Sequence, residues 1–155
     1  MRKRFVFMTI VITFLIVFTS CRSRKKEDKI EIFDSNNVKI AETEKQEELD
    51  YFSNFIGMSV ENVNDKKFDN YFKEIPDDAI KSYHLIFTSK GNHSEATKID
   101  FYIYENYPYI TMEGIPMITR PLTWQLSKED LKEFNDKVED LKEFNDKVED
   151  LKDKR

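Results

Sequence analysis

The chain has 155 residues, a net charge of −5 and one cysteine, so no disulfide can form within it. Its 30 acidic residues outnumber its 25 basic ones, which excludes nucleic acid as a partner because phosphates must be neutralised by basic side chains. The whole chain has two histidines, which are few for a histidine-based catalytic or metal site. We therefore expect no enzymatic activity, metal or cofactor.

The first 21 residues have the layout of a secretory signal. Three basic residues stand at positions 2–4, residues 5–18 are apolar and uncharged, and two small residues lead to Cys21. The apolar run is 14 residues long, which is shorter than the roughly 20 residues that a membrane-spanning helix needs. We therefore predict a signal peptide over residues 1–20.

The last four residues of this segment, Phe18-Thr19-Ser20-Cys21, resemble the lipobox of bacterial lipoproteins. In that family the chain is cut before the cysteine, whose thiol carries a diacylglycerol and whose new amino group is acylated. The resemblance implies a covalent lipid anchor on Cys21 and a place in the bacterial cell envelope, with the outer membrane preferred because Arg22 follows the cysteine. The alternatives are an uncleaved anchor and an ordinary signal peptide that contains a cysteine.

Residues 21–48 are predicted to be the lipidated cysteine and a polar tether, within which residues 29–33 alternate as a short strand would. Removal of residues 1–20 takes away three basic and no acidic residues, so the net charge changes from −5 to −8. The block 22–26 holds four more basic residues, so the remainder carries −12. This block favours an anionic leaflet or is a solvated spacer.

Residues 49–126 predict one small α+β domain. Its first apolar residues recur at helical spacing, and Gly57 is expected to end that helix. Ser59 is expected to cap a second helix that ends at Pro76, which completes an αα-hairpin.

Three strands are expected after this hairpin, over residues 83–88, 98–104 and 109–112. We predict that they form a three-stranded antiparallel meander. The helix pair should then cover the apolar face formed by Ile99, Phe101 and Ile103.

Residues 127–155 contain the sequence LKEFNDKVED twice, at 131–140 and 141–150. Ser127 and Asp130 form a capping pair, and neither Gly nor Pro follows, which predicts one helix near 25 residues long. The ten-residue period turns the apolar stripe by about 80° per copy, so a regular coiled coil is disfavoured. We expect the first copy to pack on the domain and the second to project.

The segment Gly57-Met58-Ser59-Val60-Glu61-Asn62-Val63 resembles the Gly-Met-Ser/Thr-x-x-x-Val start found in the SmpA/OmlA lipoproteins. Those proteins are small α+β subunits of the outer-membrane β-barrel assembly machinery. The resemblance implies a non-enzymatic envelope lipoprotein that works by binding other proteins.

Four tyrosines, Tyr102, Tyr104, Tyr107 and Tyr109, are the candidate partner-binding residues. The alternative is a sheet face that the C-terminal helix covers. His84 is expected on a sheet face and His93 in a solvated loop, without catalytic roles. The expected function is a membrane-anchored protein-binding module with an envelope protein as partner, and the alternative is a structural lipoprotein that self-associates weakly through its C-terminal helix.

Overall fold

The computed structural model describes residues 28–61, 63, 68–89 and 96–152. Within these ranges the strands are β1 (Lys29–Asp34), β2 (Lys39–Thr43), β3 (Lys81–Ser89), β4 (Thr97–Tyr104), β5 (Tyr109–Glu113) and β6 (Leu122–Gln125). The helices are α2 (Gln46–Glu61), the short 3-10 helix η1 (Phe68–Tyr71) and α3 (Lys128–Lys152). The predicted signal peptide, Cys21 and His93 lie outside the described residues.

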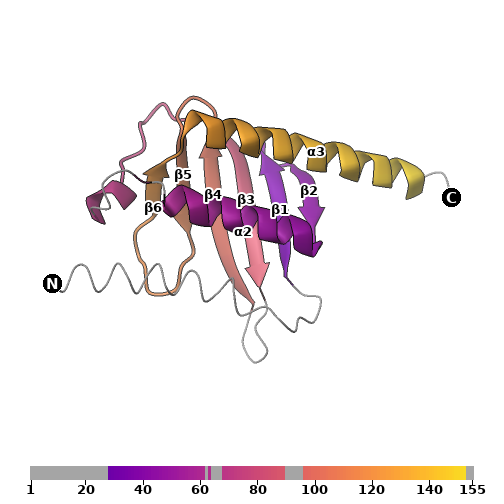
Figure 1. The fold of residues 1–155 in the computed structure, drawn as a ribbon, viewed down its shortest axis with the longest axis horizontal. Coiled ribbons are helices and arrows are strands. Elements are labelled where there is room, and N and C mark those ends of the chain that lie inside the picture. The colour runs from indigo at the N-terminus through magenta and orange to yellow at the C-terminus, as the bar shows by residue number, and fades with distance from the viewer. Residues whose placement is uncertain (1–27, 62, 64–67, 90–95, 153–155) are drawn as a thin grey trace.

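The strands form one antiparallel sheet with the order β2-β1-β3-β4-β5-β6 (Figure 1). The predicted fold class, an α+β domain with an αα-hairpin on a three-stranded meander, is therefore wrong. The sheet gains β1 and β2 from the range expected to be a tether, and β6 after the last predicted strand. The short strand suggested by the alternation at 29–33 is confirmed as β1.

The predicted αα-hairpin does not occur in the described residues, because α2 continues through Gly57 to Glu61. Ser59 lies inside this helix, where its hydroxyl donates to the carbonyl of Ile56 (2.8 Å) and accepts the indole N–H of Trp124 (3.0 Å). The Trp124 side chain is fully buried, so its N–H needs this acceptor. A tertiary contact, and not a helix cap, explains the serine.

Both α-helices pack on the same face of the sheet (Figure 1). The ring of Phe134 in α3 lies 6.0 Å from Phe52 and 5.2 Å from Phe55 of α2, and 6.0 Å from Tyr83 of β3, between ring centroids. Under the helices lie the alternating apolar residues of β4, which are buried as their pattern predicts: Ile99, Phe101 and Ile103. The hydrophobic core thus lies between the sheet and a single layer of helices.

The C-terminal segment forms a single helix of 25 residues, as predicted. At its start the Asp130 N–H donates to the Ser127 hydroxyl (3.0 Å) and the Ser127 N–H donates to the Asp130 carboxylate (3.4 Å), which is the expected capping pair. The helix crosses the sheet and extends past the edge strand β2 (Figure 1). The first repeat buries Phe134 at 1% exposure, whereas Phe144 of the second repeat is 47% exposed.

Candidate functional site

The face of the sheet turned away from the helices carries a set of aromatic and charged side chains. Strand alternation places them there, opposite the buried residues of the core. We call this surface the outer face and define it by Glu31, Phe33, His84, Ile86, Asp100, Tyr102 and Tyr109.

The centre of the outer face is a stack of two rings on neighbouring strands. His84 of β3 pairs with Tyr102 of β4, and their ring centroids lie 4.5 Å apart with an angle of 18° between the planes. On the other side of His84, the ring of Phe33 in β1 lies at 5.7 Å. Nε2 of His84 lies 2.7 Å from Oδ1 of Asp100. Three strands therefore hold the imidazole in one position.

An irregularity in β3 brings a lysine to this stack. The pairing of β3 with β4 shifts between Lys81 and Tyr83, and the Ser82 hydroxyl in between donates to the carbonyl of Ile103 (3.2 Å). Tyr83 faces α3, in step with the buried Leu85, whereas the shift places Nζ of Lys81 on the outer face, 3.7 Å from the ring centroid of Tyr102. The lysine and the ring make a cation–π contact.

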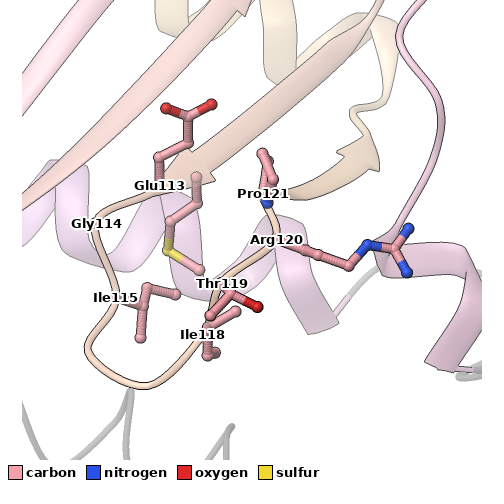
Figure 2. Close-up of a pocket in the computed structure, with 8 residues that line it drawn as sticks. Glu113, Gly114, Ile115, Ile118, Thr119, Arg120 and Pro121 are labelled. Carbon is pink, nitrogen blue, oxygen red and sulfur yellow. The ribbon is translucent and has the colours of Figure 1, made fainter.

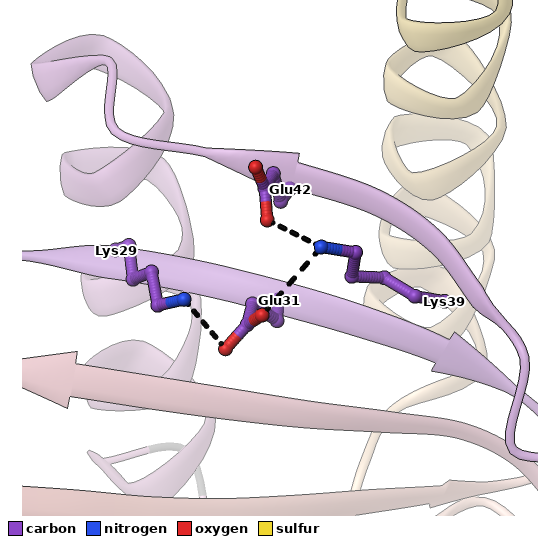
Figure 3. Close-up of polar contacts among 4 residues, drawn as sticks. All are labelled: Lys29, Glu31, Lys39 and Glu42. Atoms are coloured by element: carbon purple, nitrogen blue, oxygen red, sulfur yellow. Dashed lines mark hydrogen bonds and ion pairs between the residues drawn. The ribbon is translucent and has the colours of Figure 1, made fainter.

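Beside the aromatic centre, the edge strand β2 and its neighbour β1 carry an ion-pair network (Figure 3). The carboxylate of Glu31 lies 3.0 Å from Nζ of Lys29 and 3.7 Å from Nζ of Lys39. Lys39 also binds Glu42 at 2.6 Å, and this hydrogen bond raises the pKa of the lysine. Lys39 thus bridges two carboxylates that face each other across β1 and β2.

At the other side of the outer face, three hydroxyl groups form a buried hydrogen-bonded row. Oη of Tyr104 lies 3.1 Å from Oγ1 of Thr111, which lies 3.0 Å from Oγ1 of Thr123. All three side chains are buried, and burial raises the pKa of the Tyr104 phenol. Tyr104 therefore supports the sheet and is not a free contact residue.

The remaining tyrosines lie at one end of the same surface. Tyr107, in the β4–β5 turn, stacks on Tyr109 with 6.1 Å between centroids and donates its hydroxyl to Asp78 (2.8 Å). The side-chain amide of Asn106 donates to the Asp78 carbonyl (2.8 Å). Asp78 thus ties the segment before β3 to this turn.

The structure brings the four predicted tyrosines to one side of the sheet, but only part of this cluster is accessible. Tyr102 and Tyr109 are half-buried on the outer face, and Tyr107 stands in the adjoining turn. The alternative, in which the C-terminal helix covers the tyrosine face, is wrong because α3 packs on the opposite face through Phe134.

Three residues of this site were not predicted from the sequence: Phe33, Lys81 and Asp100. The alternation of β4 placed Asp100 on the same face as Tyr102. The predicted pairing of residues 83–88 with 98–104 is confirmed and places His84 next to Tyr102, but the pairing of β3 with β1 could not be read from the local pattern. Phe33 and Lys81 depend on that pairing and on the irregularity at Ser82.

A second feature is the loop between β5 and β6, which encloses a shallow hollow of about 280 Å³ (Figure 2). Ile115, Ile118 and Thr119 line it, and the guanidinium carbon of Arg120 lies 5.1 Å from the ring centroid of Phe72, the residue that follows η1. At the start of the loop Gly114 has a φ of 82°. A Cβ there would lie 2.9 Å from the Lys98 carbonyl oxygen, so the loop requires glycine at this position.

Among the described residues, no three His, Cys, Asp or Glu side chains lie close enough together to hold a metal ion. No helix in the described part of the chain is both long and apolar enough to cross a membrane. Comparison of the chain with protein-family models, curated proteins and solved structures finds no match.

Proposed function

We propose that the chain is a lipid-anchored lipoprotein of the bacterial cell envelope that binds a protein partner through its outer face and catalyses no reaction. The observation that carries this proposal is the stacked pair of His84 and Tyr102 at the centre of a sheet face that neither α2 nor α3 covers. A lipid on Cys21 holds the domain at the membrane, preferably the outer membrane, without a spanning segment.

The chemistry of the outer face suits a protein surface. Rings with apolar bodies and polar tips, such as those of Tyr102 and Tyr109, are enriched at the contact residues that dominate binding. Their conformational freedom is already restricted, because Tyr102 is held between His84 and Lys81. Less entropy is therefore lost when a partner binds.

The charges around the rings indicate what the partner carries. Asp100 lies directly opposite Glu113 on β5, whereas Glu31 and Glu42 on the other side of the stack already share Lys39. Neighbouring carboxylates repel each other unless a cation lies between them. We therefore expect a partner surface that combines apolar side chains with Lys or Arg.

The resemblance to the SmpA/OmlA lipoproteins contributes little to this proposal. It implied a break between two helices at Gly57, whereas α2 runs through that position to Glu61. We therefore take the class of partner from the outer face and do not assign the chain to the β-barrel assembly machinery.

Site-specific photocrosslinking in living cells tests the outer face. A benzophenone amino acid at position 102 should give a discrete crosslinked protein, and the same residue at Lys132, exposed on α3, should not. The product at position 102 should disappear when Asp100→Lys reverses a charge beside it. Equal crosslinking at both positions, or a product that Asp100→Lys leaves unchanged, would show that the outer face is not the binding surface.

The lipid anchor has its own test. The intact mass of the native protein should correspond to a chain that begins at Cys21 with added acyl groups, and Cys21→Ser should abolish both the added mass and the partition into membranes. A native chain that retains Met1, or that is released without lipid, contradicts the anchor.

One observation favours the alternative of a structural, self-associating lipoprotein. Phe144 of α3 is 47% exposed, and Nζ of Lys45 lies 3.6 Å from its ring centroid. Sedimentation of the native chain and of Phe144→Asp distinguishes the two functions. A dimer that dissociates in this variant supports self-association, whereas a monomer at all concentrations leaves partner binding as the function.

A further inference from the structure

The tip of the β5–β6 loop, Ile115–Ile118, presents apolar side chains to solvent. Met117 at its centre is 101% exposed, the highest exposure among the large hydrophobic residues described, and Pro116 is exposed beside it. Ile115 and Ile118 are partly buried against the core, so the two ends of the tip pack on the domain. An exposed apolar tip of this kind needs an explanation, because water solvates it poorly.

The backbone holds Met117 outward. The Ile118 N–H donates to the Ile115 carbonyl at 3.1 Å, which closes a four-residue turn with Pro116 second and Met117 third. Met117 has a φ of 71°, as the third residue of a type II turn requires. Glycine or asparagine suits this position better than methionine. The chain thus keeps a large apolar side chain where the backbone disfavours one.

The loop lies at the end of the sheet where the described chain begins. Lys29 at the start of β1 pairs with Thr88 near the end of β3, and the next residue of β3, Ser89, pairs with Thr97 at the start of β4. Close to that end, β4 pairs with the last residue of β5, Glu113, which leads into the loop. Figure 1 shows the β5–β6 connection and the start of β1 at the same end of the strands.

Chain length ties this end to the proposed lipid. Cys21 precedes Asp28 by seven residues, and a chain of that length spans at most about 25 Å when fully extended. A lipid on Cys21 therefore keeps the start of β1, and with it the loop, close to the bilayer surface. The opposite end of the sheet, with the β1–β2 turn, is farther away by the length of the strands.

The charges near the loop are compatible with a phospholipid surface. Lys98 and Arg120 are exposed around it, and Glu113 and Asp100 are its acidic neighbours. The segment between the lipid and the sheet adds the basic block 22–26. Basic side chains favour the anionic headgroups of a bilayer, and an apolar tip between them can enter the interface.

We propose that the loop tip Ile115–Ile118 inserts into the interface of the membrane that holds the Cys21 lipid, as a second contact that orients the domain. This inference rests on the proposed lipid anchor. One loop tip buries too little surface to hold the protein on a membrane alone. Its effect is to orient the strands away from the bilayer plane, so that the outer face stays accessible to a partner.

Depth-dependent quenching tests this contact in the full chain. Met117→Cys and Val38→Cys are labelled with a polarity-sensitive fluorophore and placed in vesicles of zwitterionic and anionic phospholipid with nitroxide-bearing acyl chains. Val38 is the matched control, since it is an apolar residue with 56% exposure in the β1–β2 turn at the opposite end. We expect several-fold stronger quenching at position 117 than at position 38.

The native chain provides the control for the anchor itself. Acylated Cys21 cannot react with the thiol label. Labelling of the native chain therefore contradicts the lipid anchor, whereas a native chain that stays unlabelled supports it. With the anchor in place, equal or absent quenching at positions 117 and 38 overturns the loop insertion alone. A second variant, Met117→Asp, should retain its lipid but no longer hold the domain in one orientation on the bilayer. A changed quenching of a label at position 38 measures this loss of orientation.

Discussion

At the scale of single residues, two glycines of this chain have opposite requirements. Gly57 lies in the interior of α2, and a Cβ built there meets no atom within 4 Å. Gly114 has a φ of 82°, and its Cβ would lie 2.9 Å from the backbone oxygen of Lys98. Gly57 lowers the stability of the fold, because a flexible glycine loses more conformational entropy on folding than alanine does. Gly114 is required by the fold.

We predict that Gly57→Ala stabilises the protein by about 0.5–1 kcal/mol, because alanine has the higher helix propensity and finds free space. Gly114→Ala is the matched control and should destabilise the protein, since alanine is strained at this backbone angle. Urea unfolding followed by the fluorescence of Trp124 measures both effects. Loss of stability in Gly57→Ala would indicate that the helix ends at this residue.

At the scale of elements, α3 shows how one sequence acquires two environments. Phe134 and Phe144 occupy the same place in two identical repeats, yet their exposures are 1% and 47%. Ten residues at about 100° each turn the second copy by about 80° relative to the first. Val138 and Leu141 continue the buried stripe, and the C-terminal end of the helix extends past the edge of the sheet (Figure 1).

The two phenylalanines therefore provide a matched pair of substitutions. Phe134→Ala should cost about 3–5 kcal/mol, because it leaves a cavity between α2, α3 and the sheet. Phe144→Ala should cost less than about 1 kcal/mol, since the side chain is half exposed and contacts Lys45. Denaturant midpoints of both variants test this, and similar losses would contradict the different burial of the repeats.

At the scale of the whole molecule, the packing of the tyrosines makes the fold sensitive to alkali. Desolvation by burial is the largest cause that raises the pKa values of Tyr51, Tyr71, Tyr83, Tyr102 and Tyr104. In the unfolded chain these phenols ionise near pH 10. A raised pKa in the folded state means that the neutral phenols stabilise the fold fully below that pH, and that this contribution is lost as the pH rises above it.

We predict that the free energy of unfolding decreases above about pH 10, because the unfolded chain releases phenolic protons that the folded chain retains. Tyr51→Phe should reduce this decrease, since Glu133 and the burial of the ring both raise the pKa of Tyr51. Denaturant titrations at several alkaline pH values measure the slope. If the free energy of unfolding falls with pH equally steeply in the variant, Tyr51 has the same pKa in the folded and the unfolded state.

Local patterns in the sequence determined much of the secondary structure. Strict alternation over residues 98–104 predicted β4 and its buried side, and the capping pair at Ser127 with the uninterrupted helical sequence after it predicted α3. The candidate tyrosines also followed from composition and alternation. Each of these features depends on residues within about ten positions of one another, which is why sequence periodicity reveals it.

Only the tertiary structure decided the extent of the sheet and the composition of the site. Trp124 draws Ser59 into a buried hydrogen bond, so α2 continues where a glycine and a serine suggested two helices. The pairing of β1 with β3, which was not predicted, brings Phe33 next to His84. Such contacts join residues far apart in the chain, and their free energy outweighs local propensities that are individually about 1 kcal/mol.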